Sequence, residues 1–242
     1  MASIRLDKYL ADAGLGTRTE VKTLIRKGRI TVNQEICRKP ETKLDPDKDV
    51  VEADGKSLSW AEHHYYMLHK PAGCVTALTD RRDPTVMELM SDVAVRDLFP
   101  VGRLDKDTEG LLLITDDGEL AHRLLSPSGH VDKTYFVRIT GKVSEDGARA
   151  LTEGLDIGEE KKTLPARLEI LKEADESEVL LTIQEGKFHQ VKRMFHAVGN
   201  EVIYLKRMSM GSLVLDEHLA AGCFRELSEE EIRMLKEDAK LV

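Results

Sequence analysis

The chain has 242 residues, 41% of them hydrophobic and 33% charged, which fits one large or two modest folded domains and excludes disorder throughout. The formal net charge of −8 by itself argues against a nucleic-acid-binding protein, because such proteins usually carry a basic surplus. The three cysteines, Cys37, Cys74 and Cys223, are too widely spaced for a disulfide framework or a zinc ribbon, and we expect reduced, inert core thiols.

The charge is distributed unevenly along the chain. Residues 1–43 carry a net charge of +5 and residues 44–242 carry −13, which predicts a basic module attached to an acidic body. The N-terminal residues lack the apolar stretch of a secretory signal. The longest strongly apolar run, residues 111–114, is far too short to span a membrane. We therefore expect a cytoplasmic protein that does not enter a membrane.

Two short helices are predicted at the start of the basic module. Leu6, Tyr9, Leu10 and Ala13 recur at helical spacing, and Gly14 is placed to end that helix. Residues 17–20 (Thr-Arg-Thr-Glu) form a capping-box sequence that opens a second helix, which ends at a glycine, residue 28. A short strand over residues 29–32 and a turn at residues 33–34 follow. We expect the last strand of the module around residues 50–51 and a linker over residues 55–62.

A row of basic residues lies on the second predicted helix. Arg18, Lys22 and Arg26 are four residues apart and therefore share one face. Such a row is often only a solvated helix face. Here no acidic residue interrupts it, and further basic residues lie nearby in the sequence, so contacts with phosphates explain it better. These further residues are Arg5, Lys8, Lys27 and Arg29.

The N-terminal fifty residues resemble the S4 RNA-binding domain, a small αL-type module. The resemblance rests on residues 5–10 (Arg-Leu-Asp-Lys-Tyr-Leu), Gly14, residues 17–18 (Thr-Arg) and residues 25–33 (Ile-Arg-Lys-Gly-Arg-Ile-Thr-Val-Asn). The sequence departs from the common pattern at Gln34, where a turn glycine is usual. The resemblance implies an S4 domain over residues 1–58, whose seven basic side chains named above contact RNA.

The acidic body contains one prominent loop. A strand is expected at residues 65–70, followed by a Pro-Ala-Gly stop. Further along, Gly102 and Gly110 bracket a charged loop that precedes a buried strand at residues 111–114, an Asp-Gly turn and a helix at residues 119–125. An acidic residue in such a loop usually does no more than keep the loop exposed to solvent. However, a buried strand would fix Asp105 on a rigid element, which makes Asp105 a candidate catalytic residue.

Strands are predicted at residues 135–139 and 179–184, with a helix from His189 to Val198 that Gly199 ends. Residues 186–207 carry five basic residues and one acidic residue, a local positive patch. A metal site at His189 is not expected, because its helix has no carboxylate or second histidine at ligand spacing. A hydrogen-bonding role near the active site is the better interpretation.

Four segments of the body look like the motifs of the pseudouridine synthases, in the order of that family. These are residues 102–105 (Gly-Arg-Leu-Asp), 110–115 (Gly-Leu-Leu-Leu-Ile-Thr), 133–135 (Lys-Thr-Tyr) and 185–195 (Glu-Gly-Lys-Phe-His-Gln-Val-Lys-Arg-Met-Phe). An S4 module followed by this set is similar to the RsuA branch, which modifies small-subunit ribosomal RNA, and Lys192 favours that branch. Related branches that act on large-subunit RNA tend to have arginine at this position.

The resemblance implies an α+β catalytic domain over residues 62–242, with a mixed, mostly antiparallel sheet flanked by helices. It implies the isomerisation of uridine in ribosomal RNA to pseudouridine, without a cofactor or a metal. Asp105 would be the catalytic carboxylate, acting on either the uracil ring or the sugar. Lys192 would keep it ionised. Tyr135 would pack against the target base.

Three further side chains are implied as RNA contacts or supports. Arg103 would contact RNA beside the target, and flipping of the target base is required. Gln190 and Arg193 would support the loop or contact a phosphate. Two alternatives stay open at this point: the same chemistry on large-subunit RNA, and a non-catalytic S4-type RNA-binding or ribosome-assembly protein. Nothing in the sequence suggests an obligate dimer, so we expect a monomer.

Overall fold

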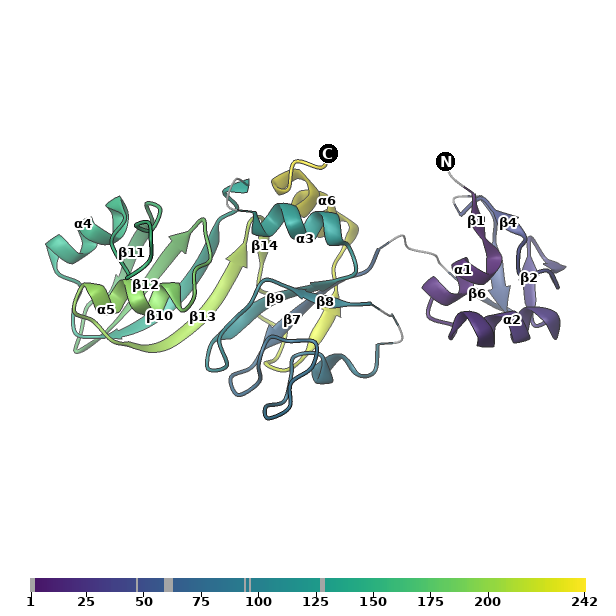
Figure 1. Cartoon of the computed structure of the whole chain (residues 1–242), viewed down its shortest axis with the longest axis horizontal. Coiled ribbons are helices and arrows are strands. Elements are labelled where there is room, and N and C mark those ends of the chain that lie inside the picture. The colour runs from purple at the N-terminus through teal and green to yellow at the C-terminus, as the bar shows by residue number, and fades with distance from the viewer. Residues whose placement is uncertain (1–2, 47, 59–62, 94, 96, 127–128) are drawn as a thin grey trace. The chain divides into compact units, whose positions relative to one another are not determined.

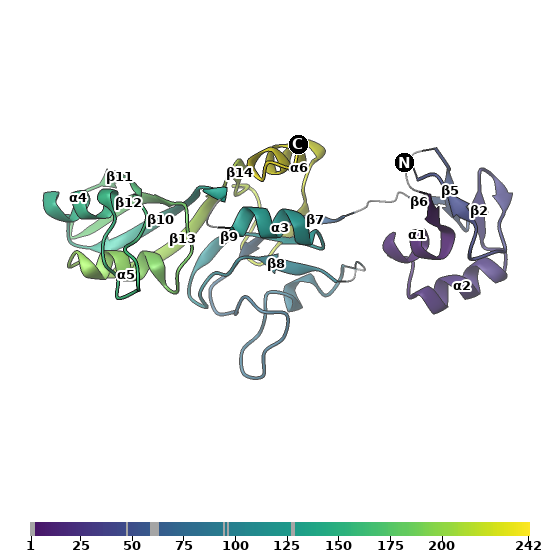
Figure 2. The same cartoon turned by 45° about the horizontal axis from the view of Figure 1, so that its top comes forward.

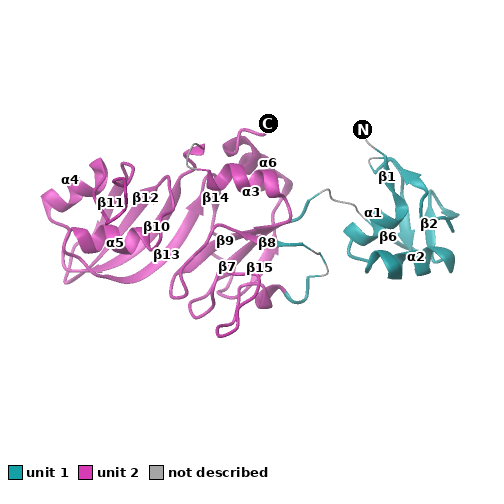
Figure 3. Cartoon of the chain, viewed as in Figure 1, with its two compact units in different colours: residues 1–64, 91–98 teal, residues 65–90, 99–242 magenta. Residues whose placement is uncertain are grey.

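The computed structural model describes residues 3–46, 48–58, 63–93, 95, 97–126 and 129–242. The chain divides into two compact units: Met1–His64 with Ser91–Leu98, and Tyr65–Met90 with Phe99–Val242 (Figure 3). No helix among the described residues is long and apolar enough to cross a membrane.

The first unit packs two helices against short antiparallel strands. The helices are α1 (Leu6–Asp12) and α2 (Arg18–Arg26). Strand β1 (Ile4–Arg5) pairs with β4 (Lys43–Leu44). A second sheet has the order β3-β2-β5-β6, formed by β2 (Ile30–Val32), β3 (Glu35–Ile36), β5 (Val51–Ala53) and β6 (Lys56–Leu58).

The predicted helix boundaries in this unit are confirmed. Gly14 and Gly28 follow the two helices with φ of +77° and +74°, the left-handed region that glycine adopts without strain. The capping box is complete: Thr17 accepts from the Glu20 backbone N–H, and the Glu20 side chain accepts from that of Thr17. The apolar stripes of both helices are buried in one core, which includes Leu6, Leu10, Val21, Ile25 and Ile30.

The predicted turn at residues 33–34 is confirmed, whereas the predictions for the last strand and for the linker need correction. The turn at Asn33 and Gln34 joins β2 to β3 with φ of 52° and 70°, so Gln34 adopts the left-handed conformation of a tight hairpin without being glycine. Strand β5, predicted around residues 50–51, begins at Val51 but is not the last strand. Asp54 and Gly55 turn the chain into β6, so the predicted linker is wrong over residues 55–58. Residues 59–62 lie outside the described residues.

The second unit is built on a nine-stranded sheet of order β11-β12-β10-β13-β9-β7-β15, with β14 paired to β13 and β8 to β9. Only the pairing of β9 with β13 is parallel among these strands, which confirms a mixed, mostly antiparallel sheet. The strands are β7 (Tyr65–Lys70), β8 (Phe99–Val101), β9 (Glu109–Thr115), β10 (Lys133–Thr140), β11 (Arg167–Lys172), β12 (Glu176–Ile183), β13 (Val202–Met210), β14 (Leu213–Val214) and β15 (Phe224–Glu226).

Two pairs of helices and a 3-10 turn (Glu88–Met90) accompany this sheet. Helices α3 (Gly118–Leu125) and α6 (Glu229–Asp238) lie over the part formed by β7, β8 and β9, where they share an apolar core with Met67 and Leu113. Helices α4 (Glu145–Glu153) and α5 (Gln190–Ala197) lie on the part formed by β10 to β13 (Figures 1 and 2). The chain is therefore an α+β protein.

Two further expectations are corrected by the structure. The Asp-Gly sequence after β9 is not a turn: Asp117 is the N-cap of α3, its side chain accepting from the Leu120 backbone N–H. The core position expected of every cysteine is found only at Cys74. Cys37 is half-buried and Cys223 is exposed.

Gly110 determines how closely two strands approach. It opens the buried part of β9 with a φ of +107°, and a side chain there would place its Cβ 2.2 Å from the Arg207 carbonyl oxygen. Only glycine therefore permits the parallel contact between β9 and β13. This contact brings the loop before β9, which carries Asp105, beside β10 and β13.

Candidate active site

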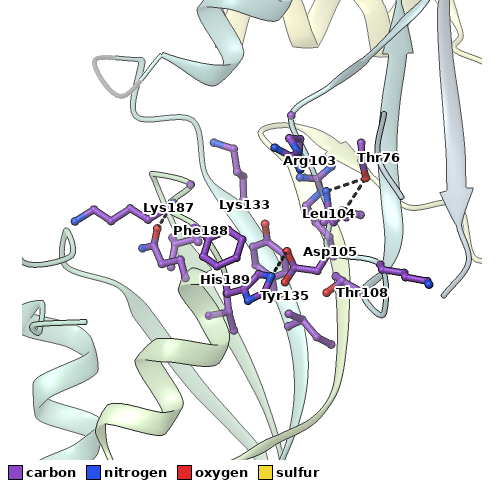
Figure 4. Close-up of a pocket in the computed structure, with 18 of the residues that line it drawn as sticks. Thr76, Arg103, Leu104, Asp105, Thr108, Lys133, Tyr135, Lys187, Phe188 and His189 are labelled. Carbon is purple, nitrogen blue, oxygen red and sulfur yellow. Dashed lines mark hydrogen bonds and ion pairs between the residues drawn. The ribbon is translucent and has the colours of Figure 1, made fainter. Parts of the chain in front are cut away.

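A cavity of about 600 Å³ lies where the loop before β9 meets β10, β13 and the start of α5 (Figure 4). The motif residues Arg103, Asp105, Tyr135 and Gln190 all line it, although they come from separate segments of the chain. Other lining residues include Thr76, Thr108, Leu125, Lys133, Ile183, Lys187, Phe188, His189, Leu205 and Arg207. Cavities of this size with a few converging polar groups are typical of binding sites for small ligands or single nucleotides.

Side chains from two other segments hold the backbone of the Asp105 loop by hydrogen bonds. The Thr76 hydroxyl donates to the Leu104 carbonyl at 2.8 Å and accepts from the Leu104 backbone N–H at 3.1 Å. The ammonium of Lys70, fully buried at the end of β7, donates to the carbonyls of Thr108 at 2.8 Å and Lys106 at 3.4 Å. Burial lowers the pKa of Lys70. Asp105 thus extends from a backbone whose carbonyls are already satisfied.

Two groups from α5 and its N-terminus approach the Asp105 carboxylate. His189 Nε2 lies 3.5 Å from one carboxylate oxygen and Lys192 Nζ lies 3.5 Å from the other. Lys192 is also 2.6 Å from Asp107, and this hydrogen bond holds the pKa of Asp107 below its usual value. The Lys192 ammonium therefore interacts with two carboxylates at once. A compact charge can do this more readily than the planar guanidinium of an arginine, which would align with one carboxylate.

The remaining predicted cavity residues differ in exposure. Tyr135, on β10, is buried with 8% of its surface exposed and pairs in register with Arg207 of β13 and Leu181 of β12. Arg103 is exposed at the cavity wall. Lys192 does not line the cavity but reaches Asp105 from its side. The structure thus brings the three predicted catalytic side chains, Asp105, Tyr135 and Lys192, to one place.

Gln190 and Arg193 are engaged within the protein. The buried amide of Gln190 donates to Glu185 at 3.0 Å and accepts from the Lys187 backbone N–H at 2.8 Å. Arg193 donates to the Phe188 carbonyl at 3.1 Å and forms an ion pair with Glu159. These contacts match the loop-supporting role considered for both residues. Contact with RNA stays a prediction.

The basic residues of the first unit fall into two groups. Three of them have acidic neighbours: Arg5 and Lys22 lie 2.9 and 3.7 Å from Asp7, and Arg29 pairs with Asp54. Arg5 holds the pKa of the Asp7 carboxyl below its usual value. The other four, Lys8, Arg18, Arg26 and Lys27, have no acidic partner within the described part of the chain. Of the seven predicted RNA-contacting cations, these four are therefore the ones most available to a phosphate.

Several residues of the site carry no recognisable signal in the sequence. Thr76 and Lys70 act by hydrogen bonds to distant carbonyls, and Arg207 by donating to the Leu111 carbonyl at 2.7 Å. Lys133 belongs to the third motif, but its burial could not be foreseen from an exposed-looking Lys-Thr-Tyr sequence. No three His, Cys, Asp or Glu side chains meet in a metal-binding arrangement among the residues that the structure describes.

Lys133 is expected to make the folding stability of the protein depend on pH. Its ammonium donates to the Val131 carbonyl at 3.0 Å, and burial together with the nearby Arg207 lowers its pKa from 10.5 to about 8. The unfolded chain therefore binds more protons than the folded chain between pH 8 and 10.5, so folding stability contributed by this group rises with pH in that window. We expect Lys133 by itself to add roughly 2 kcal/mol to the unfolding free energy of wild type between about pH 8 and about pH 10.

The variant Lys133→Met is expected to lose this rise, because it has no proton to release. Equal pH profiles for wild type and Lys133→Met, measured by urea unfolding at constant ionic strength, would show that Lys133 is not desolvated. Lys142→Met serves as the control, because Lys142 pairs with Glu173 on the surface and should leave the profile unchanged.

Comparison with known proteins identifies the family of the chain. Residues 64–197 match the RNA pseudouridylate synthase family and residues 4–51 match the S4 domain. The chain is 46% identical to the "Uncharacterized RNA pseudouridine synthase YtzG" of Bacillus subtilis (strain 168), over 97% of this chain and 99% of that protein. It is 43% identical to the "Ribosomal small subunit pseudouridine synthase A" of Escherichia coli (strain K12), over 95% and 98% of the two chains.

A solved structure described as "Crystal structure of pseudouridylate synthase" superposes with a TM-score of 0.67 at 41% identity, covering 96% of this chain and 100% of that one. The family match, the full-length identity and the fold therefore agree with one another. The chain belongs to the RNA pseudouridylate synthase family and is an isomerase with an N-terminal S4 domain.

Proposed function

We propose that this enzyme converts one uridine of small-subunit ribosomal RNA to pseudouridine in the cavity around Asp105. The observation that carries the proposal is Asp105 itself, a carboxylate on a clamped loop, paired with Lys192 and facing a cavity with Tyr135 in its wall. The small-subunit substrate is supported by the names of full-length relatives at 41–45% identity.

The proposed reaction breaks the bond between uracil N1 and the ribose C1′ and forms a bond between C5 and C1′. C5 loses a proton and N1 gains one, so the base is neither oxidised nor reduced and the reaction needs no electron acceptor. Asp105 acts in its ionised form, by adding to the uracil ring or by attack at the sugar. Lys192 stabilises that charge, and Asp107 fixes the ammonium beside it.

Tyr135 and Arg103 receive roles that depend on a flipped nucleotide. The target atoms lie inside a stack or fold, so the nucleotide must turn out into the cavity. Tyr135, buried in the cavity wall, packs against the uracil and helps to move the C5 proton. Arg103, exposed on another segment of the wall, contacts the RNA and occupies the space that the base leaves.

We assign residues 1–58 to an RNA-binding S4 domain and residues 62–242 to the catalytic domain, and infer a monomeric enzyme. The double variant Arg18→Ala, Lys22→Ala is expected to weaken binding to a small-subunit rRNA transcript. The dependence of log K on log[salt] should flatten by about 0.7 for each phosphate that the variant no longer binds. Since Asp7 lies beside Lys22 and no acid lies beside Arg18 among the described residues, we expect most of the change from Arg18→Ala. An unchanged slope in fluorescence anisotropy would contradict a phosphate-binding face.

The substrate is tested by mapping pseudouridine in both ribosomal RNAs of a strain that lacks the gene. Loss of one site in small-subunit RNA, restored by wild type, supports the proposal. Loss of a site in large-subunit RNA would assign the same chemistry to the other subunit. No lost site in either RNA, with ribosome assembly impaired, would favour a non-catalytic RNA-binding role.

A further inference from the structure

Phe188 projects from the cavity rim with 72% of its surface exposed. It is the one aromatic ring among the strongly exposed apolar side chains of the described residues. Single exposed apolar residues are common on protein surfaces and need no special explanation. Phe188 lines the catalytic cavity, as the less exposed Leu125 does, and it differs in having an aromatic ring that is held in place together with its backbone.

The ring of Phe188 is fixed from one side. It stacks on the His189 imidazole, with ring centroids 3.8 Å apart and planes 20° from parallel. Figure 4 shows the two rings together beside Tyr135 and Asp105. One face of the phenyl ring is thereby covered, and most of the rest of the side chain is open to solvent.

The backbone around Phe188 is held at several points. Its carbonyl accepts from Arg193, the neighbouring Lys187 N–H donates to Gln190, and His189 is in the left-handed conformation with φ of +47°. The Lys187 ammonium donates to the carbonyls of Lys161 and Lys162 at 2.7 and 3.0 Å. An exposed aromatic ring that is already ordered loses little conformational entropy when it binds a flat partner.

We propose that the free face of Phe188 binds an unstacked RNA base that neighbours the target uridine, a subsite separate from the cavity that receives the target. RNA bases splayed out of a helix stack on aromatic side chains, and each such stack contributes about 1–3 kcal/mol. Arg103 lines the same cavity as Phe188, and its exposed guanidinium suits a phosphate beside that base. This inference rests on the proposed RNA substrate.

The order of the rings determines which base occupies the subsite. His189 Nε2 lies 3.5 Å from Asp105, and Phe188 covers a face of that imidazole. A base on the outer face of Phe188 is therefore separated from the imidazole by the phenyl ring. The uracil that reacts must reach the Asp105 carboxylate itself, so the base on Phe188 is a neighbouring one.

The test compares Phe188→Leu, which keeps an apolar side chain but removes the flat ring, with Phe188→Tyr, which keeps the ring. The probe is the full small-subunit rRNA transcript, dye-labelled for binding and tritiated at uridine C5 for isomerisation. Phe188→Leu is expected to raise both Kd and KM about tenfold, with kcat within about twofold of wild type. Phe188→Tyr should stay within about twofold in all three. The salt slope should not change, because no charge is removed.

Val214→Ala is the matched control: Val214 is 61% exposed on β14 and does not line the cavity. Wild-type binding by Phe188→Leu would overturn the subsite. So would a loss confined to kcat, because Phe188 would then act only by orienting His189. If wild type binds the transcript but isomerises no uridine, the proposed function fails, while weaker binding by Phe188→Leu still supports the subsite. Once the uridine is mapped, an abasic neighbour should weaken binding by wild type and leave Phe188→Leu unchanged.

Discussion

Replacement of Asp105 by Asn is expected to lower the rate of tritium release from RNA carrying 5-tritiated uridine by about 10⁴-fold or more. Asparagine has nearly the same shape as aspartate, so the clamps on Leu104 and Thr108 stay in place. The amide has no negative charge and is a poor nucleophile. Either route open to Asp105, addition to the ring or attack at the sugar, therefore stops.

Binding separates this loss of chemistry from a loss of substrate. Asp105→Asn should bind the rRNA transcript within about threefold of wild type and unfold at the same temperature, because Asp105 is a quarter exposed and its removal leaves Lys192 paired with Asp107. Asp107→Asn is the control within the same loop: it keeps the catalytic carboxylate and should reduce kcat by less than about tenfold. Equal tritium release by wild type and Asp105→Asn would exclude Asp105 as the catalytic group.

The parts of the fold that the sequence predicts are those with local causes. The capping box at Thr17 and the glycines at 14 and 28 act through hydrogen bonds or dihedral angles within a few residues, so the bounds of α2 could be read directly. Strand β6 could not, because Lys56 and Ser57 are polar and exposed and the three-residue segment becomes a strand only by pairing with β5. The role of Asp117 was missed for a related reason, since Asp-Gly suits both a turn and a helix start.

The site divides in the same way. Asp105 could be located because its loop and the buried strand after it are contiguous in the sequence. The support for that loop could not, because Thr76 and Lys70 bond to backbone atoms 28 to 38 residues away. The sharing of Lys192 between Asp105 and Asp107 depends on α5 packing beside a loop 85 residues earlier. Side-chain-to-backbone contacts at this range leave no periodicity to detect.

The net charge of −8 by itself argues against RNA binding, and the positive charge of residues 1–43 answers that objection only in part. Part of the N-terminal basic surplus is neutralised, because Asp7 and Asp54 pair with Arg5 and Arg29. Arg18 and Arg26 remain unpaired among the described residues. Asp7 also fixes where the Arg5 guanidinium lies, which orders a cation that would otherwise be mobile. The RNA contact area of this domain should be correspondingly small.

Replacement of Lys192 by Met is expected to reduce kcat about 100-fold with a smaller change in Kd for RNA. The lysine side chain is only about a quarter exposed, and it places one positive charge between two carboxylates. Without Lys192, Asp105 and Asp107 repel each other. The negative charge that moves from Asp105 during the reaction then has no positive group beside it at that position. The pKa of Asp107, which Lys192 holds down, should return towards its usual value in this variant.

Lys192→Arg separates charge from geometry. Arginine keeps the charge but spreads it over a planar group that favours a bidentate contact with one carboxylate. If positive charge beside Asp105 is what matters, Lys192→Arg should retain kcat within about tenfold, whereas Lys192→Met should not. Lys142→Met removes a surface cation that pairs with Glu173 and should leave kcat unchanged. Full activity in Lys192→Met would mean that His189, at the same 3.5 Å from Asp105, is the partner that matters, and a Lys192→Met, His189→Gln double variant would then show the loss.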